Sequence, residues 1–512
     1  MSRTITNQIA SEALSHVSHE NWQSRFHPRL RDHSRGIMTT LLWFRQDLRL
    51  GDNPALARAA ERGPILPVFI LDESRAPRGR PLGGAARWWL HHALSALARA
   101  LGDLVLRRGD PRTILPELVE QSGAQAVCWN RCYEPYAIEH DQALEITLRL
   151  HGAEVETFNG SLLHEPWQLK TGAGHPFKVY TPFWRACLKQ AVDAPLPVPE
   201  FTLAKFPSTS DRIEHWRLLP TQPDWAHAFG GQWTPGEHAA HARLHEFLAG
   251  GLRGYARLRD RPDCPAVSRL SPHLHWGEIS PRQIWGATWA RVGLESGLRA
   301  DAEKFLGEIG WREFASHLLY HFPDLPQRNW KREFDTYPWQ DNPQQLRAWQ
   351  RGQTGYPFVD AGLRELWATG YMHNRARMVA ASFLVKHLRI DWRAGERWFW
   401  DTLLDADLAN NVAGWQWVAG SGADAAPFFR IFNPIEQGRK YDPDGHYVRR
   451  WCPELARLPI EYLHAPFDAP PTVLKAAGVV LGATYPFPLV EHSAARQAAL
   501  AAYAAVRRAA KQ

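Results

Sequence analysis

Short apolar runs separated by amphipathic stretches constrain the fold of the first third of this chain. The runs are LLWF (41–44), ILPVFIL (65–71), DLVLRR (103–108), AVCWN (126–130) and EVETFN (154–159). Helical patterns lie between several of them, including residues 85–101 and 136–151. Strands that alternate with helices are typical of a parallel sheet with helices on both faces. The sequence therefore predicts a doubly wound α/β domain over residues 38–170.

The remaining residues predict three further segments. Proline-rich pieces between residues 171 and 235, such as DAPLPVPEF, indicate an interdomain linker that lies across the surface. Residues 236–512 have a helical pattern, with Ser and Pro signals for helix starts in SRLSPHLHWGEISPRQIW. Residues 1–37 lack periodicity and a long apolar run. We expect them to be a disordered arm or a start assigned too early, with Met38 as the natural first residue.

Composition excludes several classes of protein. No run of 18 uncharged apolar residues occurs, so no membrane span is expected. The five cysteines are scattered, without a Cys-x-x-Cys pair or a matching His cluster. This pattern disfavours a disulfide scaffold and a metal site, and it favours the reducing cytoplasm. The net charge of +7 permits a polyanionic partner, although a basic soluble surface explains the same charge. A monomer is the simplest expectation.

Tryptophan is concentrated in the helical part. Of 24 tryptophans, 13 fall between Trp276 and Trp417. A large helical core explains this density, because aromatic side chains fill cores well. The same side chain stacks on bases and flavins and passes single electrons, and density alone does not separate these uses.

Two helical stretches carry polar groups that need partners. Residues 368–388 predict a helix whose polar head, His373 to Arg377, precedes an apolar body. The helix dipole disfavours cations at a helix start, so we expect Arg377 to pair with a phosphate or a carboxylate such as Asp405 or Asp407. Residues 306–323 predict a helix with Glu308 and Trp311 on one face, as a surface pair or as a buried acid.

Four stretches together resemble the photolyase and cryptochrome family: LLWFRQDLRLGDNPAL, WREF, TGYPFVDAGLRELWATGYMHNRARMVAASFLVKHLRIDW and GWQWVAGSGADAAPFFRIFNPIEQG. The resemblance covers about residues 39–505 and is strongest to class I cyclobutane pyrimidine dimer photolyases. It implies an α/β N-terminal domain and an all-helical C-terminal domain that holds FAD. It also implies light-driven electron donation from reduced FAD to a pyrimidine dimer flipped out of DNA.

Two alternatives stay open. A cryptochrome-type blue-light photoreceptor would share FAD and lack repair activity. DNA binding without catalysis would leave the flavin residues unexplained.

The resemblance implies the FAD contacts residue by residue. Asn411 would lie against flavin N5 and tune the flavin. Plant cryptochromes have an aspartate there and animal ones commonly a cysteine, so Asn411 favours repair. Arg377 would pair with Asp405 close to the flavin ring. Val267 stands where the family usually has threonine. The other residues implied to hold FAD are Tyr255, Val267, Ser268, Arg269, Leu270, Ser271, Asn374, Ala406 and Asp407.

The resemblance also implies the electron-transfer and lesion residues. Trp415, Trp392 and Trp339 match the inner, middle and surface members of the photoreduction chain. Glu308 matches the carboxyl group that hydrogen-bonds the dimer. Met378 stands where (6-4) photolyases have histidine, which favours cyclobutane dimers. The other residues implied to contact the lesion or the DNA backbone are Trp311, Trp417, Asn374, Arg259, Arg312, Arg375 and Arg430.

The antenna site departs from the family pattern. Class I enzymes that bind folate carry an Asn-Glu pair where this chain has Tyr136 and Ala137, and a Cys-Lys pair where it has Pro326 and Gln327. The resemblance therefore does not predict methenyltetrahydrofolate. A deazaflavin, another second chromophore or none stays open.

Overall fold

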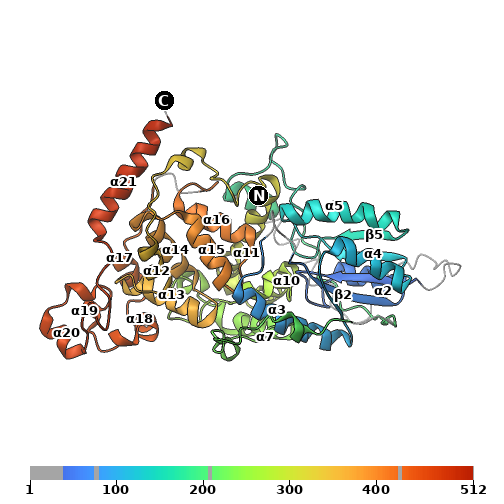
Figure 1. Ribbon diagram of the computed structural model, residues 1–512, viewed down its shortest axis with the longest axis horizontal. Helices are drawn as coiled ribbons and strands as arrows, with labels where there is room; N and C mark the ends of the chain where they lie inside the picture. The colour runs from blue at the N-terminus through green and yellow to red at the C-terminus, as the bar shows by residue number, and fades with distance from the viewer. Residues whose placement is uncertain (1–37, 74–79, 206–209, 425–428, 511–512) are drawn as a thin grey trace. The chain divides into compact units, whose positions relative to one another are not determined.

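The computed structural model describes residues 38–73, 80–205, 210–424 and 429–510 (Figure 1). Thr39–Gln512 forms one compact unit by its contacts. The expected disordered arm or misassigned start, residues 1–37, lies outside the described residues.

Five parallel strands form one sheet in the order β3-β2-β1-β4-β5. The strands are β1 (Thr40–Phe44), β2 (Ile65–Leu71), β3 (Val105–Arg108), β4 (Ala126–Asn130) and β5 (Glu154–Phe158). The chain runs outward from β1 to β3 and then returns to the other side of β1. The switch point therefore lies between β1 and β4, and ligands bind beyond the carboxyl ends of strands at such points.

Helices cover both faces of the sheet, as the sequence predicts. Successive strand residues point to opposite faces, so Leu42 and Phe44 pack with α2 (Pro54–Arg62) and α3 (Gly84–Leu101), whereas Leu41 and Trp43 pack with α4 (Pro111–Ser122) and α5 (Pro135–Leu150). Figure 1 shows α4 and α5 beside the strands. The doubly wound α/β prediction is confirmed.

The stretch expected to be a surface linker is partly built into the core. Ile65 N–H donates to Thr202 O and Ala204 N–H donates to Ile65 O, both at 2.8 Å, so this stretch runs alongside β2. Trp216 and Trp233 are buried at 2% and 3% exposure. Proline signals mark the irregular backbone correctly, but the apolar residues between them anchor it. Among the described residues of this stretch, the one α-helix is α6 (Tyr180–Cys187).

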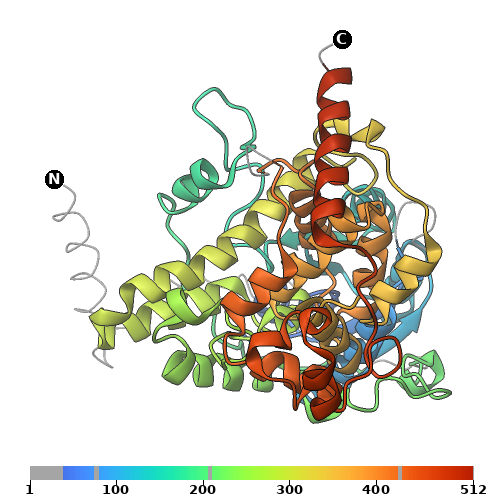
Figure 2. The same cartoon turned by 90° about the vertical axis from the view of Figure 1, so that its left-hand side faces the viewer.

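The rest of the described chain is helical. Figure 2 shows the last helix, α21, with its C-terminal end pointing away from the other helices. Within the described ranges, no helix combines the length and apolar character that a membrane crossing requires. The α-helices are α7 (Glu237–Glu246), α8 (Tyr255–Leu258), α9 (Ser271–His275), α10 (Pro281–Leu294), α11 (Arg299–His321), α12 (Pro343–Gln350), α13 (Pro357–Thr369), α14 (Asn374–Ser382), α15 (Trp392–Thr402), α16 (Leu408–Ala419), α17 (Pro434–Tyr441), α18 (His446–Trp451), α19 (Ile460–Leu463), α20 (Pro471–Ala477) and α21 (His492–Ala509).

Short 3-10 and π helices complete the chain. The 3-10 helices are η1 (Ile213–Trp216), η2 (Phe229–Gly231), η4 (Ser296–Leu298), η5 (Arg332–Thr336), η7 (Pro453–Leu455) and η8 (Pro466–Asp468). The π helices are η3 (Phe247–Gly251) and η6 (Phe383–His387).

One helix prediction is wrong in its extent. The single helix expected over residues 368–388 is broken, because α13 ends at Thr369 and α14 begins at Asn374. Gly370 has φ 67°, a left-handed conformation that ends helices and that glycine adopts without strain. The ring of His373 accepts a hydrogen bond from Arg375 N at 3.2 Å and caps the new helix. The polar head therefore lies at a true helix start.

Candidate active site

Arg377 and Asp405 form a two-bond ion pair, as the sequence predicts. Arg377 on α14 donates from Nη1 and Nη2 to the two Asp405 oxygens at 3.1 and 2.8 Å. Its Nε donates to Met372 O at 2.7 Å, which fixes the plane of the guanidinium. Burial alone would raise the pKa of Asp405, but Arg377 outweighs burial and holds this pKa below its usual range. The alternative partner, Asp407, instead caps α16 by accepting from Asn410 N at 2.8 Å.

The segment 267–271 reaches the same ion pair. The Ser271 hydroxyl hydrogen-bonds the Asp405 carboxylate. Arg269 has φ 52°, and its guanidinium carbon lies 4.4 Å from the Trp233 ring centroid and 5.0 Å from that of Tyr371. Its buried Nε has no hydrogen-bond partner within the described residues. A buried guanidinium nitrogen in this state fits an anionic ligand group such as a phosphate.

Asn411 is held in one orientation by Glu396. Its Nδ2 donates to the Glu396 main-chain oxygen at 3.0 Å and to Glu396 Oε1 at 2.9 Å. An amide nitrogen has two protons, so these two bonds use both of its donors. The amide oxygen of Asn411 is therefore the group that remains available to a ligand, and it can accept a hydrogen bond from a ligand N–H.

Glu396 is fully buried and is paired across the fold with Arg80. Arg80 Nη1 contacts both carboxylate oxygens of Glu396 and follows β2 in the α/β domain. The sequence analysis missed both residues. A usable signal existed, because Glu396 lies one turn after the buried Trp392 and places a carboxylate in the core register of α15.

Four charged side chains form a cluster that includes Glu308. Arg259 pairs with Glu308, Arg375 Nη2 pairs with Asp260 at 2.8 Å, and Arg259 Nε lies 3.9 Å from Asp260. The Tyr255 ring lies 5.6 Å from the Arg259 guanidinium carbon. Two cations and two anions compensate one another here. Asp260 was not identified from the sequence, where it is one acid among basic residues.

Aromatic and polar side chains lie on the helices that carry Glu308 and Arg375 and on α16. Trp311 on α11 is 37% exposed and Trp417 on α16 is half-buried. Asn374 Nδ2 lies 4.0 Å from the Met378 sulfur, one turn along α14. Exposed aromatic faces beside a carboxylate and arginines are typical of sites that receive an unstacked base.

Two of the expected DNA contacts lie apart from this cluster. Arg312 donates to Ser161 O at 2.7 Å, so its guanidinium is engaged by the α/β domain. Arg430 is exposed, and its main-chain oxygen accepts from Lys386 Nζ at 3.1 Å.

Several residues implied to contact FAD have side chains that are buried in the protein core. Tyr255, Leu270 and Ala406 are 5%, 2% and 3% exposed, and Val267 packs against the same core as Leu270. Ser268 lies in the loop before α9, and its hydroxyl accepts from Leu270 N at 3.4 Å. A ligand would meet the main chain of residues 267–271 more than these apolar side chains.

The three tryptophans of the expected chain belong to one hydrophobic cluster. Trp392 and Trp415 are buried at 0% and 2% exposure, and Trp339 packs against the same cluster. Trp392 Nε1 donates to Asn329 Oδ1 at 2.9 Å. The Trp415 ring lies 5.0 Å from that of Phe399. Buried indoles without a titrating partner suit electron transfer, because little solvent reorganises around them.

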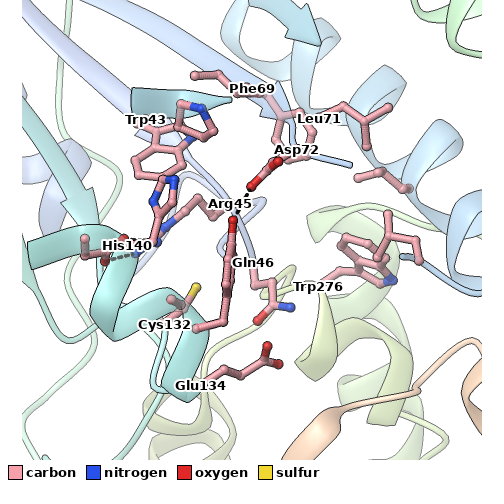
Figure 3. Close-up of a pocket in the computed structure, with 17 residues that line it drawn as sticks. Trp43, Arg45, Gln46, Phe69, Leu71, Asp72, Cys132, Glu134, His140 and Trp276 are labelled. Atoms are coloured by element: carbon pink, nitrogen blue, oxygen red, sulfur yellow. Dashed lines mark hydrogen bonds and ion pairs between the residues drawn. The ribbon is translucent and has the colours of Figure 1, made fainter. Parts of the chain in front are cut away.

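A pocket with about 60 Å³ of space open to water-sized groups lies at the carboxyl ends of β1, β2 and β4 (Figure 3). Trp43 and His140 line one side, and Trp276, which follows α9, lines the other. The Arg45 charge is compensated by Asp141 at 2.8 Å. Burial raises the pKa of Cys132 to about 11, so its thiol stays protonated. The pocket thus combines aromatic walls with an arginine whose charge is compensated inside the protein.

The described residues contain no evident set of metal ligands. No group of three or more His, Cys, Asp or Glu side chains that could hold a metal ion occurs in the described residues. All five cysteines are free thiols.

Comparisons with known proteins place these features in one family pattern. A family model described as the FAD binding domain of DNA photolyase matches residues 305–505, and one described as DNA photolyase matches residues 40–200. The deoxyribodipyrimidine photo-lyase of Agrobacterium fabrum is 53% identical over 478 residues, which cover 91% of this chain and 98% of the relative.

Two further relatives bear on the alternatives. Cryptochrome-2 of Arabidopsis thaliana is 38% identical over 90% of this chain and 77% of its own length. The crystal structure of a bacterial class III photolyase from Agrobacterium tumefaciens superposes with a TM-score of 0.89 at 52% identity and covers 94% of this chain and 100% of the relative. That relative is described as class III, whereas the sequence resemblance was assigned to class I.

Proposed function

This chain belongs to the photolyase and cryptochrome family, and from that premise we propose that it repairs cyclobutane pyrimidine dimers in DNA under light with reduced FAD as electron donor. The observation that carries the proposal is the 53% identity to a deoxyribodipyrimidine photo-lyase over 98% of that enzyme. The helical domain is an FAD-binding domain of the DNA photolyase type. We group the chain with its class III relative rather than with class I enzymes, because of the 52% identity to that structure.

The residues of segment 267–271 and the Arg377–Asp405 pair fit FAD. The buried Arg269 nitrogen without a protein partner suits the diphosphate, and the fixed guanidinium of Arg377 suits the edge of a reduced, negatively charged flavin ring. Bound and reduced FAD supplies one electron under light, which the dimer receives and returns. Every other step depends on side chains that bind, orient or exclude water.

Asn411 is assigned to flavin N5. Its two amide protons are used by Glu396, so its oxygen accepts from an N5–H group. A neutral acceptor stabilises the protonated nitrogen of the reduced ring without adding charge. Arg80 holds Glu396 in place, which makes the α/β domain a contributor to the flavin site.

Glu308 is assigned to the dimer and the arginines to the DNA backbone. Without DNA, Arg259 pairs with Glu308 and Arg375 pairs with Asp260. A phosphate that binds these guanidinium groups competes with the two carboxylates and releases Glu308 toward the lesion. Trp311 and Trp417 stack on the flipped pyrimidines, and each stacked base contributes about 1 to 3 kcal/mol.

Photoreduction is assigned to Trp415, Trp392 and Trp339. Two buried members and one partly buried member in a shared cluster support a route from the interior to the surface, and the resemblance supplies the order of Trp415 and Trp392. With FAD bound, Trp415 would pass it an electron and would be refilled through the other two. This route serves enzyme whose flavin has been oxidised.

The pocket beyond the sheet is assigned to a second chromophore. Tyr136 and Ala137, which replace the folate-binding pair of class I enzymes, line it. The pocket also abuts Trp276, next to the segment assigned to FAD. The pocket therefore lies where the strand ends of the α/β domain meet Trp276 of the helical domain.

The domain limits stay those of the sequence: residues 38–170 for the α/β domain, 171–235 for the linker and 236–512 for the helical domain. Free thiols at all five cysteines support activity in a reducing compartment such as the cytoplasm.

A cryptochrome-type photoreceptor is the second candidate. The 38% identity to an Arabidopsis cryptochrome favours it, and Asn411 argues against it because plant cryptochromes carry an aspartate at the matching position.

Repair of a defined lesion tests the proposal. Purified, reduced protein is mixed with an oligonucleotide that carries one thymine dimer, under blue light and in the dark. We expect light-dependent restoration of the two thymines, with FAD visible in the absorbance spectrum. Glu308→Ala should weaken both lesion binding and repair. Bound FAD without restoration in light would refute repair and favour the photoreceptor.

A further inference from the structure

Tyr180 lies face to face with Trp311. The two ring centroids are 3.7 Å apart and the ring planes differ by 6°. Tyr180 is the first residue of α6, in the stretch between the two domains, whereas Trp311 belongs to α11. A parallel pair at this separation is closely stacked. The segment between the domains therefore sets the plane of the Trp311 indole.

One glycine of α11, Gly310, allows this close approach. A Cβ atom at Gly310 would lie 2.6 Å from Trp184 Cε3 and 2.8 Å from the Tyr180 hydroxyl oxygen. The Tyr180 hydroxyl donates to Gly307 O at 2.7 Å. Burial raises the pKa of Tyr180, so the hydroxyl stays a neutral donor. Tyr180 is thus anchored at its ring and its hydroxyl.

The anchors show which face of Trp311 is covered. An ideal helix turns about 100° per residue, so Gly307 and Gly310 lie about 40° and 100° to one side of Trp311. Glu308 lies about 60° to the other side by the same count. Tyr180 contacts the glycine side. The uncovered indole face is therefore the one beside Glu308, and Trp311 is still 37% exposed.

We propose that Tyr180 is a positioning residue for lesion recognition, which backs Trp311 so that Tyr180, the indole and one flipped pyrimidine form a three-layer stack. This inference rests on the proposed function, because the third layer is the dimer. A platform fixed before binding has less freedom to lose when the base arrives, so it favours the damaged site over intact duplex. Tyr180 makes no part of the contacts to the DNA backbone, so these contacts contribute equally to the affinity for damaged and for intact duplex.

Three variants separate this role from general packing. Tyr180→Leu removes the stack, and Tyr180→Phe keeps the ring while it loses the bond to Gly307 O. Phe183→Leu is the matched control, because Phe183 lies on the same helix, is 1% exposed, and packs on Phe314 at 5.2 Å rather than on Trp311. For each full-length protein, affinity is measured in the dark for a duplex with one thymine dimer and for the same duplex undamaged.

The test compares the ratio of the affinity for damaged duplex to the affinity for undamaged duplex among the variants. We expect Tyr180→Leu to lower it about fivefold, in the range of an aromatic pair, with binding to undamaged duplex unchanged. Tyr180→Phe should restore the ratio to within about twofold of the parent chain, since the ring remains. Phe183→Leu should lower the melting temperature and keep the ratio.

Four results would overturn the inference. One is an unchanged ratio in Tyr180→Leu, and another is an equal loss in Phe183→Leu, which would mean general loosening of α6. Tighter lesion binding in Tyr180→Leu would mean that Tyr180 occupies the place of the base. A loss in Tyr180→Phe as large as in Tyr180→Leu would assign the effect to the hydroxyl. A parent protein that does not distinguish damaged from undamaged duplex would instead refute the proposed function itself, before any variant is compared.

Discussion

Replacing Asn411 with aspartate would bring two carboxyl groups together in a buried place. Asn411 Nδ2 lies 2.9 Å from Glu396 Oε1, and Glu396 is fully buried. The new carboxyl group in Asn411→Asp would put an oxygen where the amide nitrogen now donates. Both groups could not be ionised at that separation, so the pair would keep one proton.

The size of this effect follows from the distance. At an effective dielectric constant of about 20, two unit charges at that separation repel by about 6 kcal/mol. This corresponds to about 4 pKa units, which would move an ordinary aspartate from about 3.9 toward about 8. Arg80 stays paired with Glu396, so the proton resides on the new carboxyl group and this shift is an upper bound. We expect a titration midpoint between about 6 and 8.

Infrared difference spectra recorded from pH 5 to 10 would follow the carbonyl band of the protonated carboxyl group. The midpoint potential of the bound flavin, measured over the same range, should depart from that of the parent protein as the proton is lost. Glu396→Gln in the Asn411→Asp background removes the repelling charge and should lower the midpoint by about 2 units or more. A midpoint below about 5 in the single variant, or no change in the double variant, would contradict the geometry of this pair.

Three further predictions concern single side chains. Trp415→Phe should block photoreduction and spare repair by chemically reduced protein, and loss of both would contradict its role in the electron chain. Asp405→Asn leaves the buried Arg377 charge unpaired and should lower the free energy of unfolding by about 3 to 5 kcal/mol in urea titrations at neutral pH. Because the folded-state pKa of Asp405 is depressed, its stabilisation is present above about pH 4 and is lost as pH falls further, and an equal acid response in Asp405→Asn would refute this assignment. Burial lowers the pKa of Lys386 to about 7, so the unfolded chain binds more protons between about pH 7 and 10, and stability should rise over that range in the parent but not in Lys386→Met.

The sheet could be predicted because its signals are local. The runs that became β1, β2 and β4 are apolar except for Asn130 at the end of β4, as strands covered on both faces require. The run at 103–108 begins with Asp103, and β3 starts two residues later at Val105. The break at Gly370 was missed because a lone glycine in an otherwise periodic stretch does not by itself reveal its φ angle.

From residue patterns alone, a site contact could be predicted only where the local structure around one residue requires a partner. Arg377 at a helix start requires an anion, and this requirement narrowed the partner to a phosphate, Asp405 or Asp407, among which the family resemblance selected Asp405. Arg80, Asp260 and Tyr180 are ordinary residues in their own surroundings, and each matters through a partner brought close by the folded chain. Such pairs are set by tertiary packing, which residue spacing does not encode.

The contact between Arg80 and Glu396 limits how freely this architecture can be recombined. It joins Arg80 of the α/β domain to Asn411, the amide that we assign to flavin N5, through three side chains in series. Consider a chimaera that takes its sheet from one relative and its helical domain from another. Unless positions 80 and 396 came from the same parent, we expect the midpoint potential of its bound flavin to be altered. Under the proposed role of Asn411, positions 80 and 396 therefore tie the two domains together for redox tuning.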